Sequence, residues 1–257
     1  MSLHKDLGKQ LFESLNSGQS IAPIRDQINN DIDAAYAVQK ELVALRKARG
    51  EKVVGKKIGL TSFAVQEQLG VDQPDYGVLF DTMNLTDKGP VPMELLMQPK
   101  VEGELAFILG EDLDGPEITK EELINAISQV LPSIEIVGSR ITNWDIRISD
   151  TIADNASGSH FVLGSEGRPL TQVDTVGITM RLKRNGEIAS EGTGAACMDD
   201  PLNAALWLAK TMAKNGQPLK AGEVLLSGAL GPMVPVESGD FFSLEVDGFA
   251  PVLLRFE

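Results

Sequence analysis

Hydrophobic residues recur at helical spacing near the start of the chain and predict two helices. Leucines follow this spacing over residues 3–15, and Gly18 stands where the first helix would end. Asp31 or Asp33 can cap a second helix, because a carboxylate accepts hydrogen bonds from the free N–H groups of a first turn. We expect this second helix to end near Gly50.

From Val53 onward the pattern changes to short apolar runs separated by turn residues, which is typical of β-strands. The expected strands are 53–60, 76–80, 101–109, 132–138, 223–227 and further strands within 241–256. Asn185-Gly186 separates two further runs and predicts a hairpin, since the tight turn between paired strands needs positive φ.

Two more helices are predicted among the strands. Thr119 and Glu122 form a capping box, from which we expect a helix running to about Val130. Asp200 and Pro201 suit the cap and first turn of a helix over 201–213. The chain is therefore predicted to be an α+β protein, with a small N-terminal helical region at 1–52 and a mixed, mostly β domain at 53–257.

Composition narrows the classes of function. The chain has 257 residues and a formal net charge of -14, which argues against binding a nucleic-acid backbone. Its one cysteine, Cys197, excludes an internal disulfide and lies in an apolar stretch, so we expect a buried thiol. No signal peptide or membrane-spanning run is recognised, and a cytoplasmic enzyme is expected.

Three glutamates carry the candidate chemistry. In VEGELAFIL, Glu102 and Glu104 point to the same side if the segment is a strand. Glu135 lies among apolar residues on a second predicted strand, in LPSIEIVG. Three buried carboxylates would need a hard cation to offset their repulsion, and oxygen ligands suit Mg²⁺ or Mn²⁺. The spacing alone leaves a solvated strand face with an unrelated third glutamate equally open.

Around these residues the sequence resembles the 2-oxopent-4-enoate (2-hydroxypenta-2,4-dienoate) hydratases, in the hydratase/decarboxylase family of the fumarylacetoacetate-hydrolase-like superfamily. The similar stretches are VVGKKIGLTSFAVQEQLGVDQPDYGVLFDTM at 53–83, QPKVEGELAFILG at 98–110, residues 131–158, HFVLG at 160–164 and residues 201–240. Gly103 departs from this pattern, where alanine is expected between the two glutamates. Together the stretches cover nearly the whole chain.

The resemblance implies a mixed β-roll of the fumarylacetoacetate-hydrolase C-terminal-domain type and a usual assembly as a homo-oligomer, with a complex with a homologous decarboxylase also possible. It implies that Glu102, Glu104 and Glu135 hold Mg²⁺ or Mn²⁺, which the substrate chelates. The implied reaction is hydration of 2-hydroxypenta-2,4-dienoate to 4-hydroxy-2-oxopentanoate, in meta-cleavage degradation of aromatic compounds.

The same resemblance assigns the other site residues. Lys57 matches the family lysine that faces the substrate, with a pKa lowered by desolvation so that it can shuttle protons. Strand alternation alone does not choose between it and Lys56, which is then expected on the surface. Asp81 matches the family's active-site aspartate, although turn capping would be favoured without the resemblance. The substrate carboxylate is expected to contact the backbone at Leu60 and the hydroxyls of Ser62 and Ser157.

Four other functions compete with this prediction. A 4-oxalocrotonate decarboxylase would use the same metal chemistry, but 138–157 resembles the hydratases more. A hydratase of longer diacids is a further alternative, but its characteristic insertion before the DTIADN stretch at 150–155 is absent. A non-catalytic subunit that binds a keto acid would not need Lys57, Asp81 and three glutamates intact. A carbon–carbon hydrolase of the superfamily would use a catalytic histidine, whereas His4 and His160 lie in no matching motif.

Overall fold

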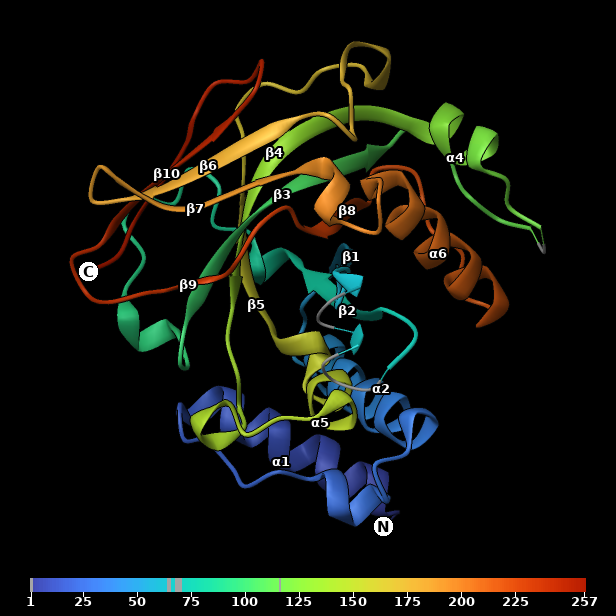
Figure 1. Cartoon of the computed structure of the whole chain (residues 1–257). Helices are drawn as coiled ribbons and strands as arrows, with labels where there is room; N and C mark the ends of the chain where they lie inside the picture. The colour runs from blue at the N-terminus through green and yellow to red at the C-terminus, as the bar shows by residue number, and fades with distance from the viewer. Residues whose placement is uncertain (1, 64–65, 68–70, 116) are drawn as a thin grey trace.

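A computed structural model describes residues 2–63, 66–67, 71–115 and 117–257 of the chain (Figure 1). The two predicted N-terminal helices are present as α1 (Leu3–Ser17) and α2 (Ile32–Ala48). Gly18 ends α1 with a left-handed φ of 69°, as expected. Asp31 is the residue that caps α2, because its side chain accepts a hydrogen bond from the Ala34 amide.

Most of the strands belong to one large, curved sheet. Among the described residues it has seven strands, in the order β2-β1-β8-β3-β4-β5, with β9 paired to β3. These strands are β1 (Val53–Gly59), β2 (Asp75–Phe80), β3 (Lys100–Leu109), β4 (Ile127–Val137), β5 (Gly158–Leu163), β8 (Val224–Ala229) and β9 (Val234–Pro235). Strands β1 and β8 are parallel, whereas β3 pairs antiparallel with both β4 and β8.

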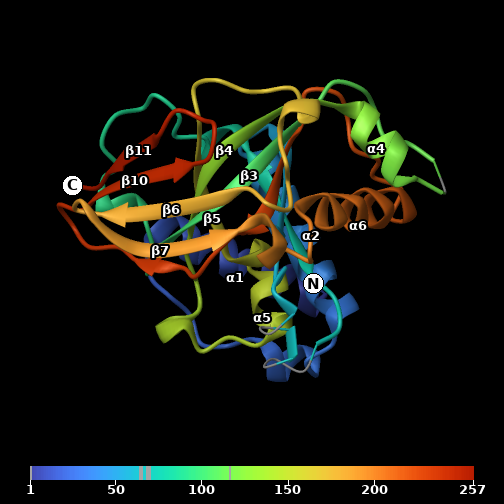
Figure 2. The ribbon, with the colours of Figure 1, turned by 45° about the horizontal axis from the view of Figure 1, so that its top comes forward.

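A second sheet packs against the first. Four strands of the described part form it in the order β11-β10-β6-β7. They are β6 (Thr179–Arg184), β7 (Glu187–Thr193), β10 (Phe241–Val246) and β11 (Val252–Arg255). The predicted hairpin joins β6 to β7, and Asn185 and Gly186 have φ of 54° and 91°. Figure 2 shows this sheet at the left and α4 (Lys120–Ala126) and α6 (Pro201–Lys214) at the right.

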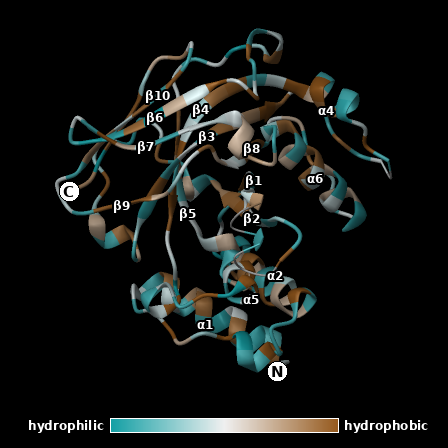
Figure 3. Cartoon of the chain, viewed as in Figure 1, coloured by the Kyte–Doolittle hydropathy of each residue, from teal (hydrophilic) through white to brown (hydrophobic). Residues whose placement is uncertain are grey.

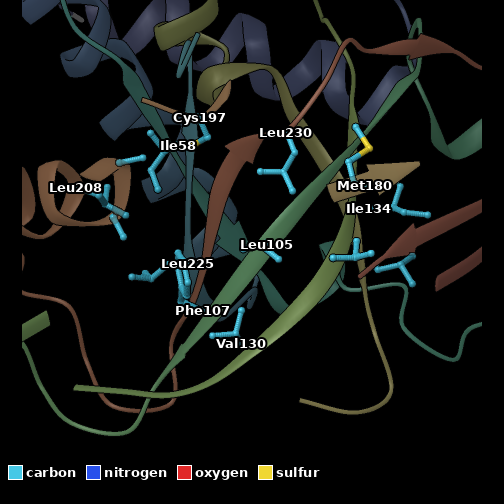
Figure 4. Packing of buried hydrophobic residues seen from close by; sticks show 14 of the residues in the cluster. Ile58, Leu105, Phe107, Val130, Ile134, Met180, Cys197, Leu208, Leu225 and Leu230 are labelled. Carbon is cyan, nitrogen blue, oxygen red and sulfur yellow. The ribbon is translucent and has the colours of Figure 1, made fainter. Parts of the chain in front are cut away.

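The main core lies between the two sheets and α6. Figure 4 shows how side chains from β3, β4, β6, β8 and α6 meet there, including Leu105, Ile134, Met180 and Leu208. A Cβ on Gly103 would lie 2.6 Å from Leu244 Cδ1, so β3 runs close beneath β10 at this point. Hydrophobic positions are concentrated in the strands, and the surface loops are mainly hydrophilic (Figure 3).

The N-terminal helices have a separate core, which they share with α5 (Ile148–Ala153). Figure 1 shows the three helices together below the sheets. Gln39 of α2 also donates hydrogen bonds to the carbonyls of Tyr76 and Ile152. The division at residue 52 stays a prediction. Short 3₁₀ helices lie at Arg25–Ile28, Asp81–Met83, Met93–Leu95, Thr142–Trp144, Asn155–Ser157, Leu170–Gln172 and Gly194–Ala196.

The α+β class is confirmed, but one predicted boundary is wrong. The capping box at Thr119 and Glu122 is present, yet α4 ends at Ala126 and β4 begins at Ile127. The helix does not reach Val130 as predicted, because β4 pairs with β3 along its length, starting with Ile127 opposite Leu109. Strand β5 and helix α5 were also not predicted. No helix in the described ranges is long and apolar enough to cross a membrane.

Candidate active site

Strand register brings the three predicted glutamates together. Glu102 of β3 lies directly opposite Glu135 of β4, and Glu104 follows two positions later on the same face of β3. One carboxylate oxygen from each residue lies within 4.8 Å of the other two. Glu104 and Glu135 are completely buried, and Glu102 is 8% exposed. A solvated strand face is therefore excluded for these residues.

The cluster has the unmet charge and hydrogen-bonding capacity of a cation site. Burial raises the pKa of all three carboxyls, that of Glu135 to about 7, and mutual repulsion raises the pKa of Glu104 further. The Gly228 amide donates to Glu104 Oε2 at 3.0 Å. Within the described part of the chain, Glu104 Oε1 and both Glu135 oxygens accept no hydrogen bond. These oxygens fit a hard divalent cation.

Lys57 points from β1 into this cluster. Its Nζ lies 3.2 Å from Glu135 Oε1, an ion-pair contact without hydrogen-bond geometry, and donates to the Ala156 carbonyl at 3.0 Å. Burial alone would lower the pKa of this lysine, but the surrounding carboxylates, Glu135 first, raise it overall. The expected lowering of the pKa is not found in this arrangement. The Lys57 side chain instead stays protonated beside the carboxylates.

Lys56 takes the opposite direction from the strand. It is only 7% exposed and lies 3.5 Å from Glu223 Oε1, so the surface position expected for it is wrong. Alternation along β1 sends Lys57 to the cluster and Lys56 to the other face. The structure therefore places Lys57, the lysine chosen by the family resemblance, at the cluster and Lys56 away from it.

A cavity of about 570 Å³ opens onto the cluster, with Lys57 and Glu102 in its wall. Three further predicted residues line it, namely Leu60, Ser62 and Ser157. Leu60 and Ser157 have left-handed φ of 56° and 53°, and Ser157 Oγ lies 2.9 Å from Thr151 Oγ1. The structure thus brings together every predicted site residue except Asp81.

Asp81 lies outside the cavity. It is exposed, and its Oδ1 accepts hydrogen bonds from the amides of Lys52 and Thr82, which is the capping role of a turn residue. Strand β2 separates it from the site: Phe80 pairs with Val53 at one end of β1, whereas Asp75 pairs with Gly59 at the other. An acid–base role for Asp81 does not fit this position.

Asp75, which the sequence reasoning missed, occupies the site in its place. It is 1% exposed and lines the cavity, and its Oδ1 accepts no hydrogen bond among the described residues. A Cβ on Gly59 would clash with this Oδ1 and lie 3.4 Å from Lys57 Nζ, so glycine makes room for both groups. Burial raises the pKa of Asp75 to about 6, although Lys57 lowers it. The sequence signal that could have identified Asp75 is an acidic residue at the start of an otherwise apolar strand, which is wholly buried in the structure.

A strained turn holds Lys57 in place. Asn155, Ala156 and Ser157 have consecutive left-handed φ of 56°, 51° and 53°, which is unfavourable for residues with side chains. The Asn155 side chain stabilises the turn, because it accepts from the Val78 amide at 2.8 Å and donates to the Val78 carbonyl at 2.9 Å. The turn thereby presents the Ala156 carbonyl to Lys57 Nζ.

The family follows from comparison with known proteins. Residues 62–256 match the family described as fumarylacetoacetate (FAA) hydrolase C-terminal. The chain belongs to this family. The fumarylacetoacetate-hydrolase-like superfamily inferred from the sequence is thereby confirmed.

Several relatives of this FAA hydrolase family member match over nearly their whole length. TodF product hydratase of Pseudomonas putida is 51% identical over 247 residues, which are 96% of this chain and 92% of the relative. A 2-keto-4-pentenoate hydratase of Paraburkholderia xenovorans is 48% identical over 254 residues, 98% and 94% of the two chains. A structure of 4-oxalocrotonate decarboxylase from Pseudomonas putida G7, complexed with magnesium and adipate, matches with a TM-score of 0.95 and 32% identity, covering 99% and 97% of the two chains.

In this member of the FAA hydrolase family, the histidines and the cysteine lie away from the cavity wall. His160 Nδ1 lies 2.8 Å from Ser159 Oγ, and burial lowers the pKa of His160 to about 4. His4 lies on α1. Cys197 is buried, donates to the Ser227 carbonyl and has its pKa raised to about 12 by burial. Cys197 is therefore the buried thiol expected from the sequence, and neither histidine is among the residues that line the cavity.

Proposed function

We propose that this enzyme hydrates 2-hydroxypenta-2,4-dienoate, the enol of 2-oxopent-4-enoate, to 4-hydroxy-2-oxopentanoate in meta-cleavage degradation of aromatic compounds. The observation that carries the proposal is the meeting of Lys57, Asp75 and a buried glutamate cluster at one cavity. Relatives named 2-keto-4-pentenoate hydratase, 48% identical over 98% of this chain, support it.

A divalent cation, Mg²⁺ or Mn²⁺, is proposed at Glu102, Glu104 and Glu135. The buried oxygens of Glu104 and Glu135 without hydrogen-bond partners suit a hard cation, and structures of the similar 4-oxalocrotonate decarboxylase are complexed with magnesium and with calcium. When bound, such a cation polarises the substrate's 2-hydroxyl oxygen and favours its ionisation. Gly228 keeps Glu104 oriented by donating to its Oε2.

Proton transfer is assigned to Asp75 and Lys57. A carboxyl with a pKa of about 6 exists in both protonation states near neutral pH, as a general acid–base requires. Asp75 can deliver a proton to C5 of the dienol while the 2-hydroxyl gives its proton to solvent, which yields the conjugated 2-oxo-3-enoate. Asp75 can then accept a proton from the water whose oxygen adds at C4 and pass it to C3. It finally regains a proton from solvent, so the net change is the addition of one water. Lys57, kept protonated by its carboxylate neighbours, can donate a hydrogen bond to the substrate oxygens while it holds Glu135 in place.

The substrate carboxylate is proposed to contact the segment that follows β1, at the backbone of Leu60 and the hydroxyl of Ser62, and also the hydroxyl of Ser157. Leu60, Ser62 and Ser157 all line the cavity. The left-handed φ of Leu60 and Ser157 turns the local backbone out of regular strand geometry. Polar backbone groups beside two hydroxyls suit an anionic group.

The direct test adds freshly prepared 2-hydroxypenta-2,4-dienoate to the protein with Mg²⁺ or Mn²⁺ and follows loss of the dienol absorbance. We expect metal-dependent consumption and 4-hydroxy-2-oxopentanoate as the product. A 4-oxalocrotonate decarboxylase is the second candidate, because a decarboxylase structure matches with a TM-score of 0.95. Release of CO₂ from 4-oxalocrotonate, with the pentadienoate left intact, would replace the hydratase proposal by that one. Consumption of neither compound would favour the third candidate, a non-catalytic subunit that binds keto acids.

A homo-oligomer, a complex with a homologous decarboxylase and a cytoplasmic location stay predictions. Light scattering coupled to size-exclusion chromatography measures the first of these. Co-purification with the decarboxylase measures the second.

A further inference from the structure

A buried hydroxyl lies beside the glutamate cluster, on the same face of the sheet. Ser133 is opposite Glu104 in the pairing of β3 with β4, as Glu135 is opposite Glu102. Ile134 points into the main core (Figure 4), so the side chains before and after it on β4 point to the other face, which carries the glutamates. The Ser133 hydroxyl is therefore a direct neighbour of the Glu104 and Glu135 side chains.

The other paired neighbours of Ser133 on this face are apolar. Leu163 of β5 lies opposite Ser133, and Phe161 precedes it by two positions on the same face of β5. Along β4 the next side chain on this face is Leu131, which pairs with Ala106 of β3. All four belong to one hydrophobic cluster or pack against it. Among these described neighbours, only the glutamates can exchange a hydrogen bond with the Ser133 hydroxyl.

Ser133 and Glu104 face each other without a direct hydrogen bond. Ser133 is completely buried, and its Oγ has no hydrogen-bond partner among the described residues. The same holds for Glu104 Oε1, whereas Glu104 Oε2 accepts from the Gly228 amide. Burying a polar group without a partner is costly, so such groups are normally paired with protein atoms or with ordered water. Two such groups at opposite positions of a strand pair indicate a partner that they share.

The lengths of the two side chains indicate what this partner is. A serine hydroxyl is attached directly to Cβ, whereas a glutamate carboxylate lies farther out along its side chain. The Ser133 hydroxyl therefore lies closer to the sheet than the carboxylates do, and it is not among the residues that line the cavity, whereas Glu102 is. A water that bridges the hydroxyl to a carboxylate oxygen suits this position, and a contact with substrate does not.

We propose that Ser133 is a positioning residue of the metal centre, whose hydroxyl shares one bridging water with Glu104 Oε1. Both oxygens of Glu104 are then fixed, Oε2 by Gly228 and Oε1 by Ser133, so that Oε1 is presented to the cation in one orientation. Groups that hold metal ligands in this way typically change metal affinity by about 10–100-fold. The proposal rests on the cation proposed at the glutamates, and not on the proposed reaction.

The test measures metal affinity in the absence of substrate. Calorimetry with Mn²⁺, repeated with Mg²⁺, gives the Kd of the wild type, Ser133→Ala and Ser190→Ala. Ser190 is the matched control, because its Oγ is also buried without a described partner but lies on β7, opposite Leu182 in the second sheet. We expect Ser133→Ala to raise the Kd by about tenfold or more, and Ser190→Ala to leave it within about twofold of the wild type.

Thermal unfolding in chelator separates positioning of the metal ligand from a role in folding. Neither serine hydroxyl has a hydrogen bond to a described protein atom, so we expect the Tm values of the two metal-free variants to agree within about 2 °C. A Tm of Ser133→Ala well below that of Ser190→Ala would assign the Ser133 hydroxyl to folding and overturn the proposal.

The metal titrations can overturn the proposal in two further ways. They are a wild-type Kd in Ser133→Ala and an equal rise of the Kd in both variants. A wild type that binds neither cation would reject the metal centre and the role of Ser133 together. The hydratase proposal is tested separately by turnover, so metal binding that depends on Ser133 in a protein that does not hydrate the pentadienoate would reject only the proposed reaction.

Discussion

Replacing Glu104 with glutamine tests the metal centre through folding stability, without requiring turnover. Glutamine keeps the size of the side chain and an oxygen that can accept from the Gly228 amide. It removes one of three carboxylates whose oxygens lie within 4.8 Å of one another. Two unit charges at this distance repel by about 3.5 kcal/mol at an effective dielectric constant of about 20. Proton uptake and Lys57 relieve part of this, so we expect Glu104→Gln to stabilise the metal-free protein by about 1–3 kcal/mol at pH 8.

Metal should reverse that order. A cation at about 100 times its Kd stabilises the wild type by about 2.7 kcal/mol, which is about 5–10 °C in Tm for a chain of this size. Glu104→Gln lacks one of the three ligands and should gain far less. Thermal unfolding of both proteins, in chelator and in Mg²⁺ or Mn²⁺, therefore has a clear expected result: the variant is the more stable protein without metal and the less stable one with it.

The pH dependence has a definite sign. Burial raises the folded-state pKa of Glu104 well above 4.5. Below pH 4.5 the carboxyl is protonated in both states and carries no penalty, and the metal-free wild type loses stability as the pH rises through the folded-state pKa. The advantage of Glu104→Gln should thus grow with pH from 4.5 upward. Glu94→Gln, at an exposed glutamate, is the control. A wild-type Tm that ignores both cations, or a variant that responds to them like the wild type, would refute the metal centre.

The remaining predictions concern protonation and the strained turn. Asp75→Asn should lower kcat by at least about 100-fold, and Asp81→Asn should leave it within about twofold, in steady-state assays with the dienoate; equal effects would contradict the assignment of Asp75. Asn155→Ala should lower the free energy of unfolding in urea by about 2–5 kcal/mol, because it leaves the Val78 backbone groups unpaired. Asn155→Gly should lower it by about 1 kcal/mol less, because glycine adopts the φ of 56° freely. Equal losses in the two variants would exclude backbone strain at this position. Burial lowers the pKa of His160 to about 4 from 6.5, so the protein should lose up to about 3 kcal/mol as the pH falls through that window, and unfolding curves of His160→Gln should lack this loss.

Local signals in the sequence were sufficient for many elements. The caps at Asp31, Thr119 and Asp200 and the turn at Asn185-Gly186 depend on contacts within a few residues, so residue type alone predicts them. The end of α4 was predicted wrongly because it depends on a partner distant in sequence. Strand pairing with β3 makes Ile127 the first residue of β4 instead of part of a helix.

For the candidate site too, the sequence determined some features and the tertiary structure decided the others. The sequence by itself, through its composition and family resemblance, determined the α+β class, the glutamates and the choice of Lys57. Only the tertiary structure placed Glu135 opposite Glu102, because the register between strands is a long-range property. The same physical reason separates Asp75 from Asp81. They flank one strand, β2, and only its antiparallel pairing with β1 decides which of its two ends faces the cavity.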